Sequence, residues 1–215
     1  MKPLRGLYAI TPESLVRGER TPLLAAVAAA IRGGARLIQY RDKWRSGKQR
    51  VALARALLTV CHDGGAQLII NDDVELALAS GADGVHLGRG DGSLAAARAR
   101  LGSGALIGAS CQDSLPRAME ALAAGADHVA FGRFFTSTTK PEAPPAHVST
   151  LHAARLALRA PICAIGGITP ATAPLVIAAG ADLVAAVDGV FGAADVEAAA
   201  RAYTRAFTDA GLRKV

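Results

Sequence analysis

Aromatic residues are scarce in this sequence, making up 4% of its 215 positions. Alanine, leucine, valine and glycine dominate instead, which favours short-looped helices packed on parallel strands over an aromatic-rich binding sandwich. No segment reaches about 18 uninterrupted apolar residues, the length that a membrane-spanning helix needs. Residues 1–10 also lack the apolar run of a secretory signal. We therefore expect a cytoplasmic protein with no membrane partner.

Cysteine is also rare, and its pattern argues against a zinc site. Cys61, Cys111 and Cys163 are odd in number and widely spaced, without the paired spacing of a zinc site. They indicate buried thiols in a reducing compartment.

The net charge of +6 comes from scattered basic residues that are not interleaved with aromatics. We therefore expect no nucleic-acid partner, since a few well-placed cations would serve small anionic substrates.

Eight short apolar segments, each typical of a buried strand, alternate with helical patterns. They are residues 4–10, 37–41, 68–71, 85–87, 106–110, 129–133, 162–165 and 183–187. A Gly-Ala pair repeatedly ends a helix and leads into the next strand, at 34–35, 65–66, 81–82, 125–126 and 180–181. This pattern predicts one α/β domain over residues 1–215, a single (β/α)8 TIM barrel with its chemistry on the loops after the strands. A doubly wound open sheet is the alternative, but no glycine-rich dinucleotide fingerprint follows the first strand.

Two aspartates stand at the ends of two successive predicted strands. Asp72 follows the third strand and Asp91 lies just beyond the fourth. Parallel strands joined by a right-handed crossover end at the same edge of the sheet, so both carboxylates should open onto one crevice. Such a pair indicates Mg2+, held by few protein ligands and completed by substrate phosphate. Helix capping is the ordinary alternative for either residue.

A cationic motif follows the second strand, at Gln39-Tyr40-Arg41-Asp42-Lys43. Side chains alternate along a strand, so Gln39, Arg41 and Lys43 should share one face while Tyr40 and Asp42 take the other. Two cations and an amide at a barrel mouth would form an anion cradle. A solvated strand end could carry the same charges.

A second group of loops also suits an anion. Residues 132–141, after the sixth strand, gather hydroxyls and Lys140, while Gly166-Gly167 and Val187-Asp188-Gly189 follow the seventh and eighth strands. The last two loops are where barrels commonly hold a phosphate with backbone N–H groups. Ser110 ends the fifth strand without a partnered base, so we expect no nucleophilic serine. Two anion regions would suit a reaction between two phosphorylated small molecules.

Several short motifs, in order along nearly the whole chain, together resemble the thiamine phosphate synthase family. They are residues 8–11, 39–43, 71–72, 84–88 with Asp91, 132–140 and 164–168. The resemblance implies a TIM-barrel transferase that condenses 4-amino-2-methyl-5-hydroxymethylpyrimidine diphosphate with 4-methyl-5-(2-phosphooxyethyl)thiazole. It further implies Mg2+, a dissociative reaction through a pyrimidine methyl cation, and two phosphorylated small-molecule substrates. A homo-oligomer is compatible with it.

The resemblance also implies a role for individual residues. The pyrimidine diphosphate site would comprise Gln39, Tyr40, Arg41, Asp42, Lys43, Asn71, Ser110 and Lys140, with Arg41, Lys43, Ser110 and Lys140 as its catalytic members. Asp72 and Asp91 would hold the metal. The thiazole phosphate site would comprise Thr136, Ser137, Thr138, Gly167, Val187 and Asp188.

Two positions depart from the family pattern. Arg89 stands where glutamine is usual, and Asp188 where serine is common. A carboxylate facing a phosphate would repel it, so we expect the backbone of Asp188 to bind and its side chain to turn away. These departures keep two alternatives open: a thiazole tautomerase of the same superfamily, and a non-catalytic paralogue that binds thiazole phosphate. The tautomerase is disfavoured because an isomerase needs no site for a diphosphate leaving group.

Two further residues have only structural expectations. His86 lies within a strand and is expected to be a packed wall residue, because the five histidines form no metal constellation. Arg133 is the last residue of the sixth predicted strand, where its side chain would face either the mouth or the outer helices.

Overall fold

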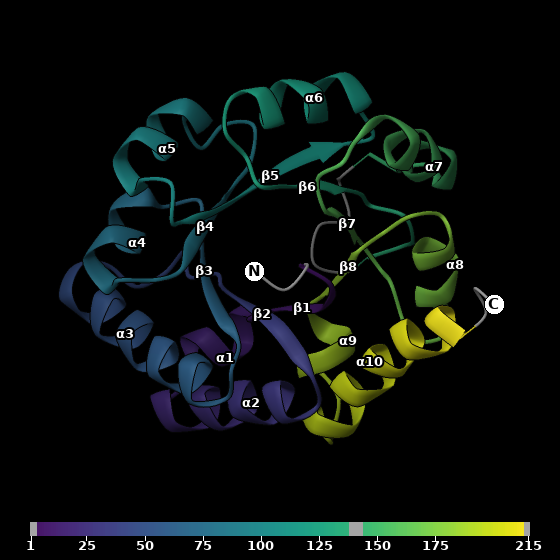
Figure 1. Ribbon diagram of the computed structural model, residues 1–215. Coiled ribbons are helices and arrows are strands. Elements are labelled where there is room, and N and C mark those ends of the chain that lie inside the picture. Colours follow the sequence, from purple (N-terminus) through teal and green to yellow (C-terminus); the bar gives the residue numbers. More distant parts are fainter. Residues whose placement is uncertain (1–3, 138–143, 213–215) are drawn as a thin grey trace.

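The computed structural model describes residues 4–137 and 144–212, which form a closed barrel of eight parallel strands in sequential order, β1 to β8 (Figure 1). This confirms the predicted (β/α)8 barrel. The strands are β1 Gly6–Ile10, β2 Ala35–Tyr40, β3 Gln67–Asn71, β4 Gly84–Leu87, β5 Leu106–Gln112, β6 His128–Phe131, β7 Ile162–Ile165 and β8 Leu183–Ala186. The sixth strand is shorter than expected because the chain leaves the ladder after Phe131, and the Arg133 N–H donates to the Pro144 carbonyl.

Helices form the outer ring around the strands (Figure 1). They are α1 Glu13–Arg17, α2 Arg20–Arg32, α3 Gly47–Asp63, α4 Val74–Ser80, α5 Leu94–Leu101, α6 Leu115–Ala123, α7 Val148–Ala157, α8 Ala173–Ala178, α9 Asp188–Phe191 and α10 Val196–Leu212. Among residues 4–137 and 144–212, no helix has the length and apolarity needed to cross a membrane.

The period of two along each strand divides the apolar residues into two layers. Leu7 and Ala9 point outward into the large core between strands and helices, whereas Tyr8 and Ile10 point into the barrel. The interior layer is small: Tyr8, Ile10, Leu37, Ile69, Ala130, Cys163, Leu183 and Ala185. Small side chains on β6 and β8 leave room above this layer, which is where the strands end.

A Gly-Ala-Asp sequence repeats at the end of the barrel where helices return to strands. In each copy the glycine takes a left-handed φ, which glycine adopts without a Cβ clash. The aspartate then accepts a hydrogen bond from the N–H of the first or second residue of the preceding strand: Asp83 from Leu68 at 2.7 Å, Asp127 from Ile107 at 2.7 Å and Asp182 from Ile162 at 2.9 Å. These carboxylates tie successive units together at the end of the barrel where the strands begin, and leave the strand ends for chemistry.

Candidate functional site

A cavity of about 570 Å³ occupies the mouth of the barrel at the carboxyl ends of the strands, and all eight strands or the loops that follow them line it. The predicted site residues that line it are Gln39, Arg41, Asn71, Asp91, Ser110, Thr136, Ser137, Gly167, Val187 and Asp188. An adjoining hollow of about 420 Å³ shares Asn71 and Asp91 and is also lined by Asp42, Lys43 and Asp72. Residues from distant parts of the sequence therefore meet in one place. Thr138 and Lys140 lie outside the described residues.

Arg41 provides the cation at the exit of β2. Its backbone N–H donates to Thr11 Oγ1 at 3.0 Å, which fixes the start of the loop. Its side chain lines the larger cavity, and its buried Nε has no hydrogen-bond partner in the described part of the chain. A buried donor without a partner is costly, and more so when it carries charge. Arg41 is thus arranged to receive an anionic acceptor from the cavity.

Tyr40 and Asp42 point to the opposite face from Arg41, as the alternation predicts. The Tyr40 hydroxyl donates to Asp42 Oδ2 at 2.6 Å, and Asp42 Oδ1 accepts from the N–H groups of Trp44 and Arg45 at 2.8 and 2.9 Å. Burial acts to raise the pKa of Asp42, but these hydrogen bonds and the Arg45 charge outweigh it and hold the pKa below its usual value. Both Asp42 oxygens are therefore already engaged.

The role in pyrimidine diphosphate binding that the resemblance implied for these two residues stays a prediction. Tyr40 is fully buried and reaches neither cavity, and Asp42 borders the smaller hollow with its oxygens already used. Their hydrogen bonds shape the turn that presents Arg41 and Lys43. Sequence parity indicated the face correctly, but not the hydrogen bonds that occupy it.

Neither Asp72 nor Asp91 caps a helix in the described chain. Capping falls to their neighbours: Asp73 accepts from the Leu76 N–H of α4 at 2.8 Å, and Ser93 caps α5. Asp72 takes a left-handed φ of +65°, a conformation in which aspartate is enriched among non-glycine residues. That conformation directs the chain so that Asp73, and not Asp72, meets the helix. The Asp72 carboxylate thus remains at the mouth.

The two aspartates lie close together in the site. Asp72 Oδ2 is 3.3 Å from Lys43 Nζ, and Asp91 Oδ2 accepts the Gly88 N–H at 2.8 Å. Burial, followed by the hydrogen bond with Asp72 and the Asp72 charge, raises the pKa of Asp91. Asp72 and Asp91 repel each other when both are ionised, and a cation between them would stabilise both charges.

Two carboxylates are a donor set that suits hard, oxygen-preferring cations. Within residues 4–137 and 144–212, no cluster of three or more His, Cys, Asp or Glu side chains could form an all-protein cage. Mg2+ needs no such cage, because it keeps several waters and commonly binds through one or two carboxylates and substrate phosphates. Asp72 and Asp91 supply that minimal set. Zinc prefers nitrogen and sulfur ligands, and no histidine or cysteine is among the described residues that line the smaller hollow with the two aspartates.

Across the barrel, the loops after β6, β7 and β8 pack closely on one another. Gly167 has a φ of +63°, and a Cβ there would lie 2.1 Å from the Thr136 carbonyl oxygen. Its N–H donates to no backbone acceptor among the residues described. The Tyr203 hydroxyl of α10 donates to the Ile168 carbonyl at 2.7 Å and would clash with a Cβ on Gly189. These contacts hold backbone N–H groups at the cavity wall, where a phosphate could accept from them.

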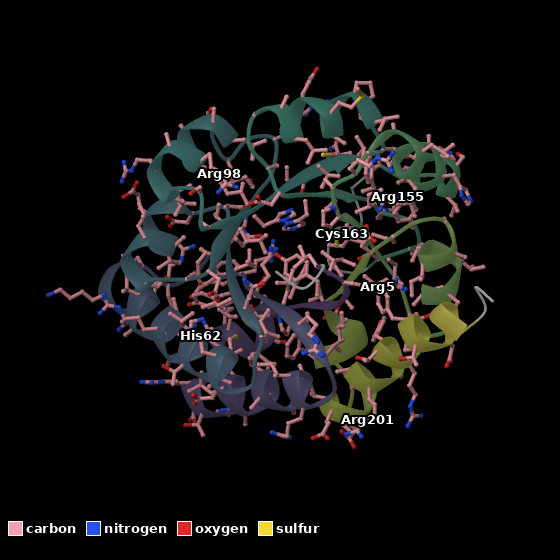
Figure 2. The ribbon with its side chains drawn as sticks, in the orientation of Figure 1. Arg5, His62, Arg98, Arg155, Cys163 and Arg201 are labelled. Atoms are coloured by element: carbon pink, nitrogen blue, oxygen red, sulfur yellow. The ribbon has the colours of Figure 1, made fainter. Side chains whose placement is uncertain are left out.

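A buried thiol also lines the cavity. Cys163 lies inside the ring of strands (Figure 2), with 1% of its surface exposed. Burial raises the pKa of this thiol to about 12, so it stays protonated and is a poor nucleophile. All three cysteines are buried, as the sequence indicated.

Other cavity residues were uncertain or absent in the sequence prediction. His86 is a wall residue, as expected, and is 7% exposed. Arg133 and Arg89 both line the mouth, which resolves Arg133 in favour of the mouth over the outer helices. Gln112 was missed, because the register of β5 against β6 shifts between Ser110 and Gln112, and Gln112 takes a φ of +57°. Simple alternation cannot find a side chain beyond such an irregularity.

Comparisons with known proteins agree with this geometry. A family model described as thiamine monophosphate synthase matches residues 7–190. A thiamine-phosphate synthase of Methylococcus capsulatus is 53% identical over 199 residues, which cover 93% of this chain and 88% of the relative. One of Nitrosococcus oceani is 51% identical over 211 residues, covering 98% and 96%. The solved structure of a thiamine phosphate pyrophosphorylase from Pyrococcus furiosus matches with a TM-score of 0.86 at 31% identity, covering 95% of this chain and 96% of that one.

Proposed function

This chain belongs to the thiamine monophosphate synthase family, and from that premise we propose that its barrel mouth joins a pyrimidine diphosphate to a thiazole phosphate. The substrates would be 4-amino-2-methyl-5-hydroxymethylpyrimidine diphosphate and 4-methyl-5-(2-phosphooxyethyl)thiazole. The products would be thiamine phosphate and diphosphate. Such a reaction is an alkyl transfer, in keeping with the transferases to which the chain is similar.

One observation carries the proposal: the cavity and its adjoining hollow have groups that suit a phosphate, or a metal ion bound to a phosphate, on two separate arcs of the barrel mouth. Arg41, Lys43 and the two aspartates stand after β2, β3 and β4, while Gly167 and Asp188 stand after β7 and β8. In a closed barrel with strands in sequential order, these arcs face each other across the mouth. A site for one phosphorylated ligand would need only one of them.

The first arc suits a leaving group. Arg41 and Lys43 would bind the diphosphate, together with Asn71, which borders both cavities, and Lys140 would join them. Asp72 and Asp91 would hold Mg2+, which when bound would neutralise charge on the diphosphate oxygens. Asp42, through its hydrogen bonds to the turn, would keep Arg41 and Lys43 in position.

The chemistry then requires little beyond charge stabilisation. Loss of diphosphate leaves a pyrimidine methyl cation, and the thiazole nitrogen captures it with its own lone pair. That step needs no general base, which suits a cavity whose one thiol is protonated. Gln39 and Ser110 would contact the pyrimidine ring. Groups fixed in advance around developing charge lower such barriers most effectively.

The second arc suits the thiazole phosphate. Thr136 and Ser137 offer hydroxyls, and Gly167, Val187 and Asp188 offer backbone N–H groups; Thr138 would extend this set. Asp188 is exposed at the rim. We propose that its backbone and not its carboxylate meets the phosphate, because two negative groups in contact would repel.

A product assay tests the proposal. Purified protein is incubated with both substrates, with and without Mg2+, and thiamine phosphate and diphosphate are quantified. We expect equal amounts of both products, and only with Mg2+. Absence of both products, with thiazole phosphate still bound, would replace the proposal with the non-catalytic binding role.

A further inference from the structure

His86 has a polar contact that reaches a proposed substrate residue. On β4 its Nε2 lies 2.9 Å from Ser110 Oγ on β5. Ser110 lines the cavity, and His86 forms the wall beneath it. A serine hydroxyl has one proton and two lone pairs and rotates to suit its neighbours. Whether His86 Nε2 carries a proton therefore decides whether the Ser110 hydroxyl donates to the imidazole or accepts from it.

His86 is one of three residues that align across neighbouring strands. His86, Gly108 and His128 pair in register across β4, β5 and β6. A Cβ on Gly108 would lie 2.4 Å from His86 Nδ1 and 2.4 Å from His128 Nε2. The missing side chain thus leaves the space in which the two imidazoles meet, with their ring centroids 5.7 Å apart.

Tyr8 closes this cluster from β1. Its ring packs edge-on to His86 at 6.3 Å and to His128 at 6.1 Å, and its hydroxyl accepts from Gln39 Nε2 at 2.8 Å. Tyr8, His86 and His128 are all less than a tenth exposed. Packed side chains of this kind have few alternative rotamers. The cluster of Tyr8, His86 and His128 therefore supports Gln39 and Ser110, the two residues proposed to contact the pyrimidine ring.

We propose that His86 is a positioning residue that takes the Ser110 hydroxyl proton into a hydrogen bond at Nε2, so that Ser110 presents lone pairs to the amino group of the pyrimidine. The inference rests on the proposed function and adds a residue to which that function gave no role. An acceptor on the amino N–H strengthens electron donation from that nitrogen into the ring. The ring is then better able to carry the positive charge that follows diphosphate loss. His86 thus acts through Ser110 without touching the substrate.

The test is a double-mutant cycle between the two residues. The variants are His86→Asn, Ser110→Ala and the pair together, each assayed for kcat and KM toward both substrates. Loss of one neutral hydrogen bond predicts about a tenfold fall in kcat/KM for the pyrimidine diphosphate in His86→Asn. The KM for thiazole phosphate should not change. In the Ser110→Ala background, His86→Asn should cost less than about twofold more, because the group it acts through is gone.

A conservative variant separates positioning from packing. The amide of glutamine reaches the place of Nε2, whereas that of asparagine reaches only the place of Nδ1. His86→Gln should therefore recover most of the activity that His86→Asn loses, while the two variants melt at similar temperatures. The Mg2+ concentration for half activity should be the same in both, which excludes an effect through the backbone bond between His86 and Asp72.

Two results would overturn the inference. One is an equal loss from His86→Asn in the presence and absence of the Ser110 hydroxyl; the other is a His86→Gln variant as poor as His86→Asn. Both leave the proposed function intact if the wild-type protein makes thiamine phosphate. Wild-type protein that makes none would instead refute the proposed function, and the positioning role with it.

Discussion

Replacing Asp72 with asparagine removes one of the two charges proposed to hold Mg2+ while keeping the shape of the site. Asparagine tolerates the left-handed φ of +65° at this position better than most residues, so the backbone should not move. The lost contact with Lys43 is partly exposed and contributes little to folding. Asp72→Asn is therefore a change in charge with little change in stability.

The expected effect on metal binding can be worked from Coulomb's law. Two unit charges about 4 Å apart attract by about 1 kcal/mol in bulk water, so a carboxylate attracts a divalent ion by about 2 kcal/mol. The watery limit applies because the Lys43 and Asp72 side chains are 52% and 27% exposed. Since about 1.4 kcal/mol corresponds to a factor of ten, the Mg2+ concentration for half activity should rise about thirtyfold.

The neighbouring aspartate provides a matched control. Asp73 caps α4 and pairs with Arg50 at 2.6 Å. Asp73→Ala should therefore cost about 1 kcal/mol of stability and lower the melting temperature by about 2 to 4 °C. The Mg2+ concentration for half activity of Asp73→Ala should stay within about twofold of the wild-type value. A change of about 1.4 kcal/mol in metal binding would shift it about tenfold.

The assay is diphosphate release at saturating substrates across a Mg2+ titration, with thermal melting of each variant. An unchanged half-activity concentration in Asp72→Asn would remove Asp72 from the metal site. Equal shifts in Asp72→Asn and Asp73→Ala would mean that the effect is general to this loop.

Three further predictions concern other parts of the barrel. Burial, then the nearby His86, lowers the pKa of His128 to about 3, so the native state stays neutral while the unfolded chain binds a proton below about pH 6.5. The free energy of unfolding should therefore fall as pH drops from about 6.5 towards 3. Between pH 6.5 and 4.5, this fall should be about 2 kcal/mol smaller in His128→Gln than in the wild type, as measured from melting curves. An equal fall in both proteins would contradict this. Gly167→Ala places a Cβ 2.1 Å from the Thr136 carbonyl and should raise the KM for thiazole phosphate more than that for the pyrimidine diphosphate, whereas equal rises would speak against a thiazole phosphate site there. Lys140→Ala should lower turnover at least about tenfold with little change in melting temperature, since the charge of a single lysine rarely contributes much to folding; comparable activity would remove Lys140 from the mechanism.

The barrel itself could be predicted from sequence because its signals are local. Each Gly-Ala pair marks a helix end, and each short apolar run marks a strand, so eight units could be counted without tertiary information. Strand parity also placed Gln39 and Arg41 on the side of the larger cavity and Tyr40 away from it, whereas Lys43, expected on the same face as Arg41, lines the smaller hollow with Asp42. Alternation within one strand is enough for that inference.

The rest depended on contacts that no single segment reveals. The φ of Asp72 decides which of two adjacent aspartates, Asp72 or Asp73, caps α4. The sequence alone does not distinguish them, because both are aspartates that follow the same strand. The meeting of His86 and His128 depends on Gly108, which lies about twenty residues from each in sequence and next to each in the sheet. The engagement of Asp42 likewise needed the Tyr40 hydroxyl, together with a turn at Trp44 and Arg45. Sequence periodicity gives the face of a side chain, but not its partners.

The central claim is that one cavity holds two anionic ligands on separate arcs of its rim. Calorimetric titration of thiazole phosphate into protein saturated with Mg2+ and diphosphate tests it most directly. The account predicts one thiazole phosphate bound per chain, with an affinity that does not fall as the diphosphate concentration is raised. An apparent dissociation constant that grows in proportion to diphosphate would mean that both anions compete for one site, and would contradict the account.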